Sequence, residues 1–274
     1  MKLFCTISLI LCASSTYSQV MSVDSVQELK LAQPVERATI APSGKYLLLS
    51  DYNYSGLTKV DLTSNEEKIV TRAAGAGYNA KVLDNDDIIY REVIKSPLKE
   101  TAIKRYFSST GNSATLTRSN VQPENAIEAN NVTTGTDFQL KLTVGGETST
   151  LSPLGNDKRY IWPSISPDGT KLLFFVSAQG AYISDLDGNN VKELGIIRAP
   201  KWYGNNIVVG QRDYDDGYVT TSSSIVAKNI DTSEEQTLTQ ENIIAMYPSV
   251  SEKGDKILFS TPEGKAYLIH INIK

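Results

Sequence analysis

Cysteine and histidine are scarce in this sequence. It has two cysteines, Cys5 and Cys12, and a single histidine, His270. Both cysteines precede residue 19, where we expect the mature chain to begin, so disulfides, thiolate metal sites and cysteine nucleophiles are excluded from that chain. One histidine cannot form a site with several histidine ligands, and no Gly-x-Ser-x-Gly motif accompanies it, as it would in many serine hydrolases. We therefore expect no metal, no cofactor and a structural role for His270.

An excess of positive charge is also absent. The chain has 27 Lys and Arg against 31 Asp and Glu, which gives a net charge of −4. Domains that bind nucleic acid usually present a basic surface to the phosphates. Nucleic acid is therefore not an expected partner.

Long hydrophobic runs are missing as well, apart from a short one at the N-terminus. Lys2 precedes the apolar run Leu3–Ala13, and Thr16–Ser18 follows as a cleavage site. This order is typical of a secretory signal peptide, here residues 1–18. The run is shorter than the roughly 20 residues that a membrane-spanning helix needs. A lipoprotein acylated at Cys12 is the alternative, although the residue before Cys12 is larger than such a site usually has.

The sequence does contain a repeated pattern of a short strand, a tight turn and an apolar strand. Its clearest copy covers residues 161–176, where a Ser-Pro-Asp-Gly turn precedes the run Leu172–Val176. Consecutive apolar residues indicate a strand that is buried on both faces. A third and a fourth strand follow, and four short antiparallel strands make one blade of a β-propeller.

The spacing of the copies predicts how many blades there are. The turns at Pro42, Pro167 and Glu252 lie 125 and 85 residues apart (167 − 42 and 252 − 167), close to three and two periods of about 42. Weaker copies occur at 80–90 and 200–209, and a sixth unit without a clear turn motif is expected within 120–152. The pattern therefore predicts six blades.

The two ends of the chain predict how the ring closes. The last unit supplies only three strands, whereas Val26–Ala32 is a spare strand before the first turn. Pairing the spare strand with the C-terminal strand completes the last blade and removes exposed sheet edges. The predicted fold is all-β, a single six-bladed β-propeller over residues 19–274 that is closed by its N-terminal strand.

The blocks Ser-Pro-Asp-Gly-x-Lys-Leu-Leu-Phe and Tyr-Ile-x-Asp-Leu-Asp-Gly resemble the WD-like repeats of TolB-like six-bladed propellers. They are also similar to the propeller domains of dipeptidyl-peptidase and prolyl-oligopeptidase enzymes. The matching residues are turn and core positions, so the resemblance implies a fold and leaves the activity open. TolB itself has an additional N-terminal domain, and the peptidases have a hydrolase domain. The 256 residues after the signal peptide (274 − 18) leave room for neither.

Aligning the turns predicts which side chains line the central channel. The first ring is Arg37, Asn79, Trp162, Ala199 and Tyr247. The second ring is Thr39, Lys81, Ser164, Lys201 and Ser249. Because the second ring is polar and holds two lysines, it suits an anion, an acidic side chain or a carboxylate terminus. The alternative is a wet channel filled by ordered water.

Three loops between second and third strands differ from the rest. They are 51–56 in the first blade, the insertion 93–103 in the second, and 212–218 in the fifth. Tyrosine suits recognition because it offers apolar area with a polar tip. The candidate binding residues on this face are Tyr52, Tyr54, Asp213, Tyr214, Asp215 and Tyr218. The segment 213–217 resembles the start of a calcium loop, but Ser224 occupies the position of its final acid, so a hairpin with turn residues is favoured.

These observations favour an exported, non-enzymatic scaffold that binds another envelope protein or a peptide. We expect a monomer in the periplasm or outside the cell, without a transmembrane segment in the mature chain. The alternatives are a stand-alone relative of the peptidase propellers, a polysaccharide-acting propeller, and a protein that binds a small ligand or carbohydrate in its channel. The lone histidine and the lack of metal ligands count against an enzyme.

Overall fold

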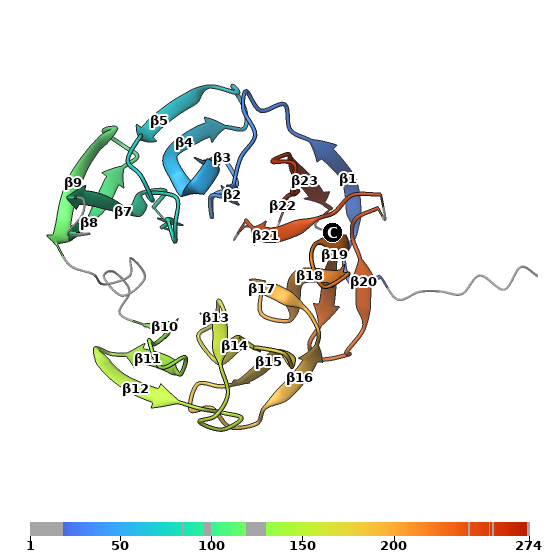
Figure 1. Cartoon of the computed structure of the whole chain (residues 1–274). Coiled ribbons are helices and arrows are strands. Elements are labelled where there is room, and N and C mark those ends of the chain that lie inside the picture. Colours follow the sequence, from blue (N-terminus) through green and yellow to red (C-terminus); the bar gives the residue numbers. More distant parts are fainter. Residues whose placement is uncertain are drawn as a thin grey trace, which may run out of the picture.

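The computed structural model confirms a six-bladed β-propeller, in which six sheets surround a central opening (Figure 1). It describes residues 19–83, 85–95, 100–118, 130–240, 242–251, 253 and 255–272. The predicted signal peptide, residues 1–18, lies outside this part.

Five sheets have four antiparallel strands each, ordered from the channel outward. The first blade is β2 (Arg37–Ile40), β3 (Tyr46–Asp51), β4 (Ser55–Asp61) and β5 (Glu67–Thr71), with the 3-10 helix η1 (Tyr52–Tyr54) between β3 and β4. The second is β6 (Lys81–Val82), β7 (Ile88–Lys95), β8 (Glu100–Phe107) and β9 (Asn112–Arg118). The fourth is β13 (Tyr160–Ile165), β14 (Lys171–Val176), β15 (Gly180–Asp185) and β16 (Lys192–Gly195). The fifth is β17 (Arg198–Tyr203), β18 (Ile207–Asp215), β19 (Thr220–Asn229) and β20 (Glu235–Thr237).

The third sheet is described with three strands, β10 (Asn131–Thr134), β11 (Leu140–Val144) and β12 (Glu147–Leu151). β12 leads into the link to the fourth blade, as the outermost strands of other blades do. The hairpin before β11 contains Phe138 at a φ of 61°, and the hairpin between β14 and β15 contains Ala178 at 62°. The three strands therefore correspond to the second, third and fourth strands of a blade. The residues just before β10, 119–129, lie outside the described part.

The N-terminal strand closes the ring, as predicted. β1 (Val23–Glu28) pairs antiparallel with β23 (Ala266–Ile271), outside β22 (Lys256–Ser260) and β21 (Met246–Val250). The strand begins and ends earlier than the predicted bounds, 26–32, because residues 29–36 link β1 to the first blade. Val20, Val23 and Val26 pack against the core of the last two blades, so β1 contributes apolar burial as well as backbone pairing.

The apolar core lies between neighbouring blades. One cluster joins the fourth and fifth blades and includes Leu173, Phe175, Trp202 and Val208. A comparable cluster joins the first and second blades through Leu48, Tyr90 and their neighbours. Second strands such as β14 are buried along almost their whole length because a blade covers each face. This packing explains why consecutive apolar residues, rather than alternating ones, mark these strands.

Antiparallel pairing gives the disc two different faces. The turns between first and second strands and between third and fourth strands lie on one side, which we call the turn face. The hairpins between second and third strands and the links between blades lie on the other, which we call the loop face. The predicted insertion 93–103 belongs to the loop face, but much of it continues β7 and β8 as a long hairpin, and residues 96–99 lie outside the described part.

Candidate binding face and channel mouth

Four blades share an unusual backbone at equivalent positions, within the innermost strand in three of them and just before β6 in the second. Asn79, Trp162, Ala199 and Tyr247 have φ values between 46° and 56°. The strand register shifts across three of them, in β13, β17 and β21, and a proline follows each of these three. Proline cannot donate to a ladder, so it suits a bulge on an edge strand. In the first blade Arg37 occupies this position without a bulge, because β2 pairs with β3 in continuous register.

The predicted first ring does not present one kind of surface to the channel. Ala199 is buried, and the Trp162 ring packs edge-to-face on Phe175 with 5.4 Å between ring centroids. Asn79 already interacts with another residue. Arg37 and Tyr247 instead meet each other, with the guanidinium carbon 5.7 Å from the centre of the Tyr247 ring.

A polar network supports Tyr247 from the fifth blade. The Tyr247 backbone N–H donates to Gln211 Oε1 at 2.6 Å, and Gln211 Nε2 donates to Asp213 Oδ2 at 3.4 Å. Arg198 Nη1 also contacts Asp213 Oδ2, at 3.0 Å. The Asp213 side chain is only 7% exposed, and its Oδ1 has no hydrogen-bond partner. Asp213 was predicted as a free loop residue, but it lies in β18. There it supports the channel mouth, the loop-face end of the central opening where Arg37 and Tyr247 meet.

The predicted second ring is partly used by the fold itself. The Ile40 backbone N–H donates to Ser249 Oγ at 3.1 Å and thereby links β2 to β21. Lys81 and Lys201 each interact with another residue. Ser164 Oγ is buried without a hydrogen-bond partner, and Thr39 is half-buried on β2.

Aromatic rings and a second arginine continue the mouth from the first blade to the second. Tyr54 and Tyr78 pack edge-to-face at 5.6 Å, and the Arg91 guanidinium carbon lies 5.4 Å from the centre of the Tyr78 ring. Tyr54 is thus half-buried rather than free, unlike the exposed Tyr52. The close approach of these segments requires Gly77, since a Cβ there would lie 2.3 Å from Ser50 Cβ.

Exposed apolar side chains gather on the loop face. Among the described residues, thirteen large hydrophobic side chains are exposed, and ten of them lie in loop-face hairpins, in links between blades or at the start of an innermost strand. These ten are Tyr52, Tyr78, Val93, Ile94, Phe138, Ile196, Tyr214, Tyr218, Val219 and Tyr247. Isolated surface hydrophobics are ordinary, but here most of the exposed ones lie on one face.

The hairpin between β18 and β19 shows how the chain presents such a residue. Asp216 Oδ1 accepts the backbone N–H groups of Tyr218 and Val219, each at 2.9 Å. These two N–H groups hold the pKa of Asp216 below its usual value. The cap fixes a tight tip on which Tyr218 is 95% exposed. Asp215, predicted as a loop residue, ends β18 just before this tip and caps Gly217 instead.

Neither the described residues nor the depressions they form point to a metal centre. No group of three or more His, Cys, Asp and Glu that could hold a metal ion occurs among them. His270 lies with Asp24 and Asp255 beside an open depression of about 440 Å³. A second hollow, of about 310 Å³, lies between the link after β1 and the first blade, with Asp51 and Arg72 in its wall.

Several residues of this face were not found from the sequence, namely Tyr78, Arg91, Phe138, Arg159, Arg198 and Gln211. The Arg159 guanidinium carbon lies 4.5 Å from the centre of the exposed Phe138 ring, so a third arginine–aromatic pair occurs at the third and fourth blades. The available signal was an arginine at or just before three innermost strands, at Arg37, Arg159 and Arg198. That pattern does not predict which aromatic ring each arginine contacts, because most of the rings belong to other segments of the chain.

No protein-family model and no curated protein matches the sequence. No helix in the described part is both long and apolar enough to span a membrane. Among solved structures, a TolB-like protein from Agrobacterium tumefaciens is similar, with a TM-score of 0.60 and 16% identity over 89% of this chain and 93% of that chain. An oligogalacturonate lyase in complex with manganese has a TM-score of 0.46 and 14% identity over 89% and 79%. TolB from Acinetobacter baumannii has a TM-score of 0.39 and 12% identity over 88% and 55%. The chain therefore has the six-bladed β-propeller fold of TolB-like proteins.

Proposed function

We propose that this protein is an exported, non-enzymatic scaffold that binds another envelope protein or a peptide with its loop face. The observation that carries the proposal is the concentration of exposed apolar side chains there, ten of thirteen in the described chain. Exposed aromatic residues cost free energy of hydration unless a partner covers them, and Tyr and Trp are enriched where partners bind.

The construction of the face supports binding rather than catalysis. Tyrosines stand on hairpins whose backbones are fixed by caps and ladder bonds, as at Asp216, so little ordering is needed when a partner arrives. The arginines at the channel mouth add directional donors. Export is proposed from the signal-peptide pattern of residues 1–18.

Affinity capture from the envelope fraction tests this proposal. The mature chain, 19–274, is compared with a variant carrying Tyr52→Ala, Tyr214→Ala and Tyr218→Ala. Tyr54 is left unchanged because it packs on Tyr78. The matched control carries Ile69→Ala, Leu116→Ala and Val144→Ala, the three exposed hydrophobics that lie away from the loop face.

We expect the parent and the control to capture the same protein and the tyrosine variant to lose it, with unchanged thermal unfolding of all three. Equal capture by parent and tyrosine variant would refute a role for these tyrosines. Loss in the control alone would place binding elsewhere on the disc. Capture of nothing specific by the parent would refute the scaffold.

A further inference from the structure

Two arginines at the channel mouth have no acidic partner among the residues that the structure describes. The Arg37 guanidinium lies over the Tyr247 ring, and the Arg91 guanidinium lies over the Tyr78 ring. Within the described residues neither forms an ion pair, whereas Arg105, Arg198 and Arg212 each pair with a carboxylate. The Arg91 Nε is buried and has no hydrogen-bond partner. A buried guanidinium nitrogen without a hydrogen-bond partner is unusual.

Contact with a ring limits the freedom of each guanidinium. The guanidinium carbon lies over the ring at a cation–π distance, 5.7 Å from the ring centre for Arg37 and 5.4 Å for Arg91. Because each side chain is already held in this way, less side-chain freedom is lost when a carboxylate accepts N–H groups from it. Tyr247 is itself held by the hydrogen bond from its backbone to Gln211. The two arginines are therefore pre-oriented donors.

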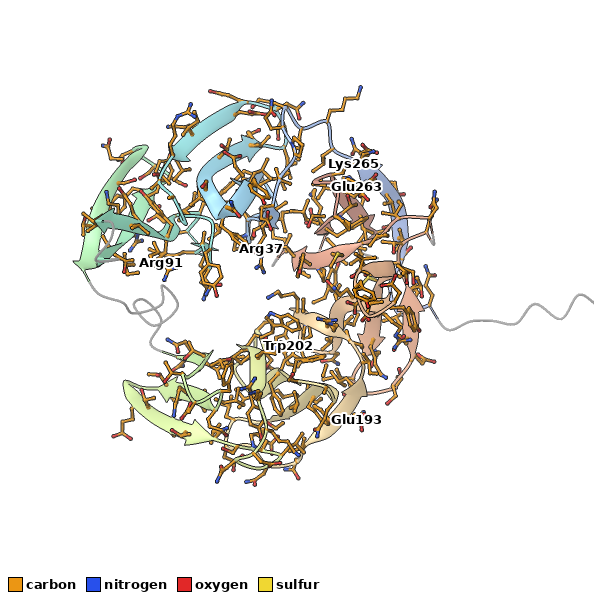
Figure 2. All side chains as sticks on the ribbon, viewed as in Figure 1. Arg37, Arg91, Glu193, Trp202, Glu263 and Lys265 are labelled. Atoms are coloured by element: carbon orange, nitrogen blue, oxygen red, sulfur yellow. The ribbon has the colours of Figure 1, made fainter. Side chains whose placement is uncertain are left out.

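The two pairs belong to one continuous arc. Ser50 Oγ donates to the Arg37 carbonyl oxygen at 3.4 Å, and Gly77 packs directly on Ser50. Gly77 also donates its N–H to the Tyr54 carbonyl oxygen at 2.9 Å, and Tyr78 follows it in the chain. Figure 2 shows Arg37 and Arg91 on the inner margins of neighbouring blades, bordering the central opening. A ligand that reaches one of them is therefore close to the other.

We propose that this arc binds an acidic peptide segment, whose carboxylates are held by Arg37 and Arg91. The inference rests on the proposed function and names the chemistry of the partner. A peptide fits better than a small anion because the exposed rings of Tyr247 and Tyr78 lie against the arginines and can cover the rest of the segment. The complementary charge also attracts such a segment to a disc that is otherwise acidic.

Fluorescence anisotropy with labelled peptides tests the inference on residues 19–274. The probes are hexaglutamate and hexaglutamine, which have the same length and differ in charge. We expect hexaglutamate to bind about tenfold more tightly at low salt, with affinity that falls as salt is added. The Arg37→Gln, Arg91→Gln variant should lose that difference.

The matched control carries Lys45→Gln and Lys253→Gln, which remove two exposed cations from the turn face, and it should bind as the parent does. The Arg37→Lys, Arg91→Lys variant keeps the charge but lacks the planar guanidinium, so we expect its affinity for hexaglutamate to lie between those of the parent and the glutamine variant. If the glutamine variant fails to fold, the comparison of this lysine variant with the parent tests the inference. Three results would overturn the inference. The parent could bind both peptides equally, the Arg37→Gln, Arg91→Gln variant and the Lys45→Gln, Lys253→Gln control could lose hexaglutamate affinity equally, or a uronic-acid hexamer could bind more tightly than hexaglutamate. Capture of a partner through the tyrosines without glutamate selectivity would refute only the acidic segment and leave the scaffold standing.

Discussion

Two aspartate–arginine ion pairs, one on each face of the disc, are built very differently. On the turn face, Asp87 accepts Arg105 Nε and Nη2 at 2.8 and 2.7 Å, the Ser108 N–H at 2.9 Å and Asn85 Nδ2 at 3.1 Å. On the loop face, Asp213 accepts Arg198 and a long contact from Gln211, and its buried Oδ1 has no partner. Both carboxylate oxygens of Asp87 therefore accept hydrogen bonds, whereas only one of those of Asp213 does.

The same contrast extends over both faces. The turn face is capped locally, for example by Asp61 Oδ1, which accepts the N–H groups of Thr63 and Ser64 at 2.8 Å each. Asn229 does the same for Asp231 and Thr232. The loop face has such caps too, as at Asp216, but it also carries ten of the thirteen exposed large hydrophobic side chains of the described residues and two arginines that lie over aromatic rings. The two faces therefore differ chiefly in the apolar and arginine side chains that the loop face exposes.

The largest effect is expected from Asp87→Ala on the turn face. The change leaves Arg105 without its carboxylate, and Arg105 is 28% exposed, so water compensates in part. We expect a loss of about 3 kcal/mol in the free energy of unfolding, measured by urea denaturation at pH 7. Unchanged stability would contradict the view that this face holds the fold.

The pH dependence of this variant sharpens the test. Burial alone would raise the pKa of Asp87, but the Ser108 N–H and the Arg105 guanidinium outweigh it and hold the pKa below its usual value. The ionised carboxylate therefore stabilises the fold above its unfolded pKa of about 3.9, and this contribution is lost as the pH falls through the lowered pKa. The difference between parent and variant should shrink below about pH 4.

Gly77→Ala, in the arc of the loop face, is expected to lower the free energy of unfolding by less. The new Cβ would lie 2.3 Å from Ser50 Cβ, so two segments must separate at a cost of about 1–3 kcal/mol. Hexaglutamate affinity should fall as well, because Tyr78 and Arg91 move with Gly77. In the control, Gly75→Ala, the Cβ meets open space and the cost comes only from a φ of 72°. Equal hexaglutamate binding by Gly77→Ala and the parent would show that the arc tolerates the separation.

The smallest effect is expected from Asp213→Ala, the counterpart of Asp87→Ala. Arg198 is 45% exposed, so water hydrates it after its partner is removed. The substitution also removes Asp213 Oδ1, whose burial without a hydrogen-bond partner destabilises the parent. We expect a loss of about 1 kcal/mol, well below that of Asp87→Ala. Urea denaturation of both variants under the same conditions measures the two losses in the free energy of unfolding. Equal losses would contradict the difference that we infer between the two ion pairs.

Much of the fold could be predicted because each blade repeats a local pattern. The Ser-Pro-Asp-Gly turn and the apolar run of β14 are decided by residues close in sequence, which is why the first, fourth and sixth units were clear. The third unit lacked a turn motif, and only its strand near 138–144 was found. The candidate site was harder, because loop residues such as Asp213 and Tyr54 were expected to be free and are engaged by neighbours.

The number of blades, the closure by an N-terminal strand and the two faces follow from the amino-acid sequence, because strand period, turn chemistry and antiparallel order act locally. Which side chains meet at the channel mouth depends instead on how the blades are arranged in space. Arg37 stacks on Tyr247, a residue 210 positions away (247 − 37), because the ring brings the first and last blades together. Left-handed residues in the innermost strands also turn Trp162 and Ala199 into the core rather than the channel. These contacts join residues that lie far apart in the sequence, so no local pattern of residues predicts which side chains meet.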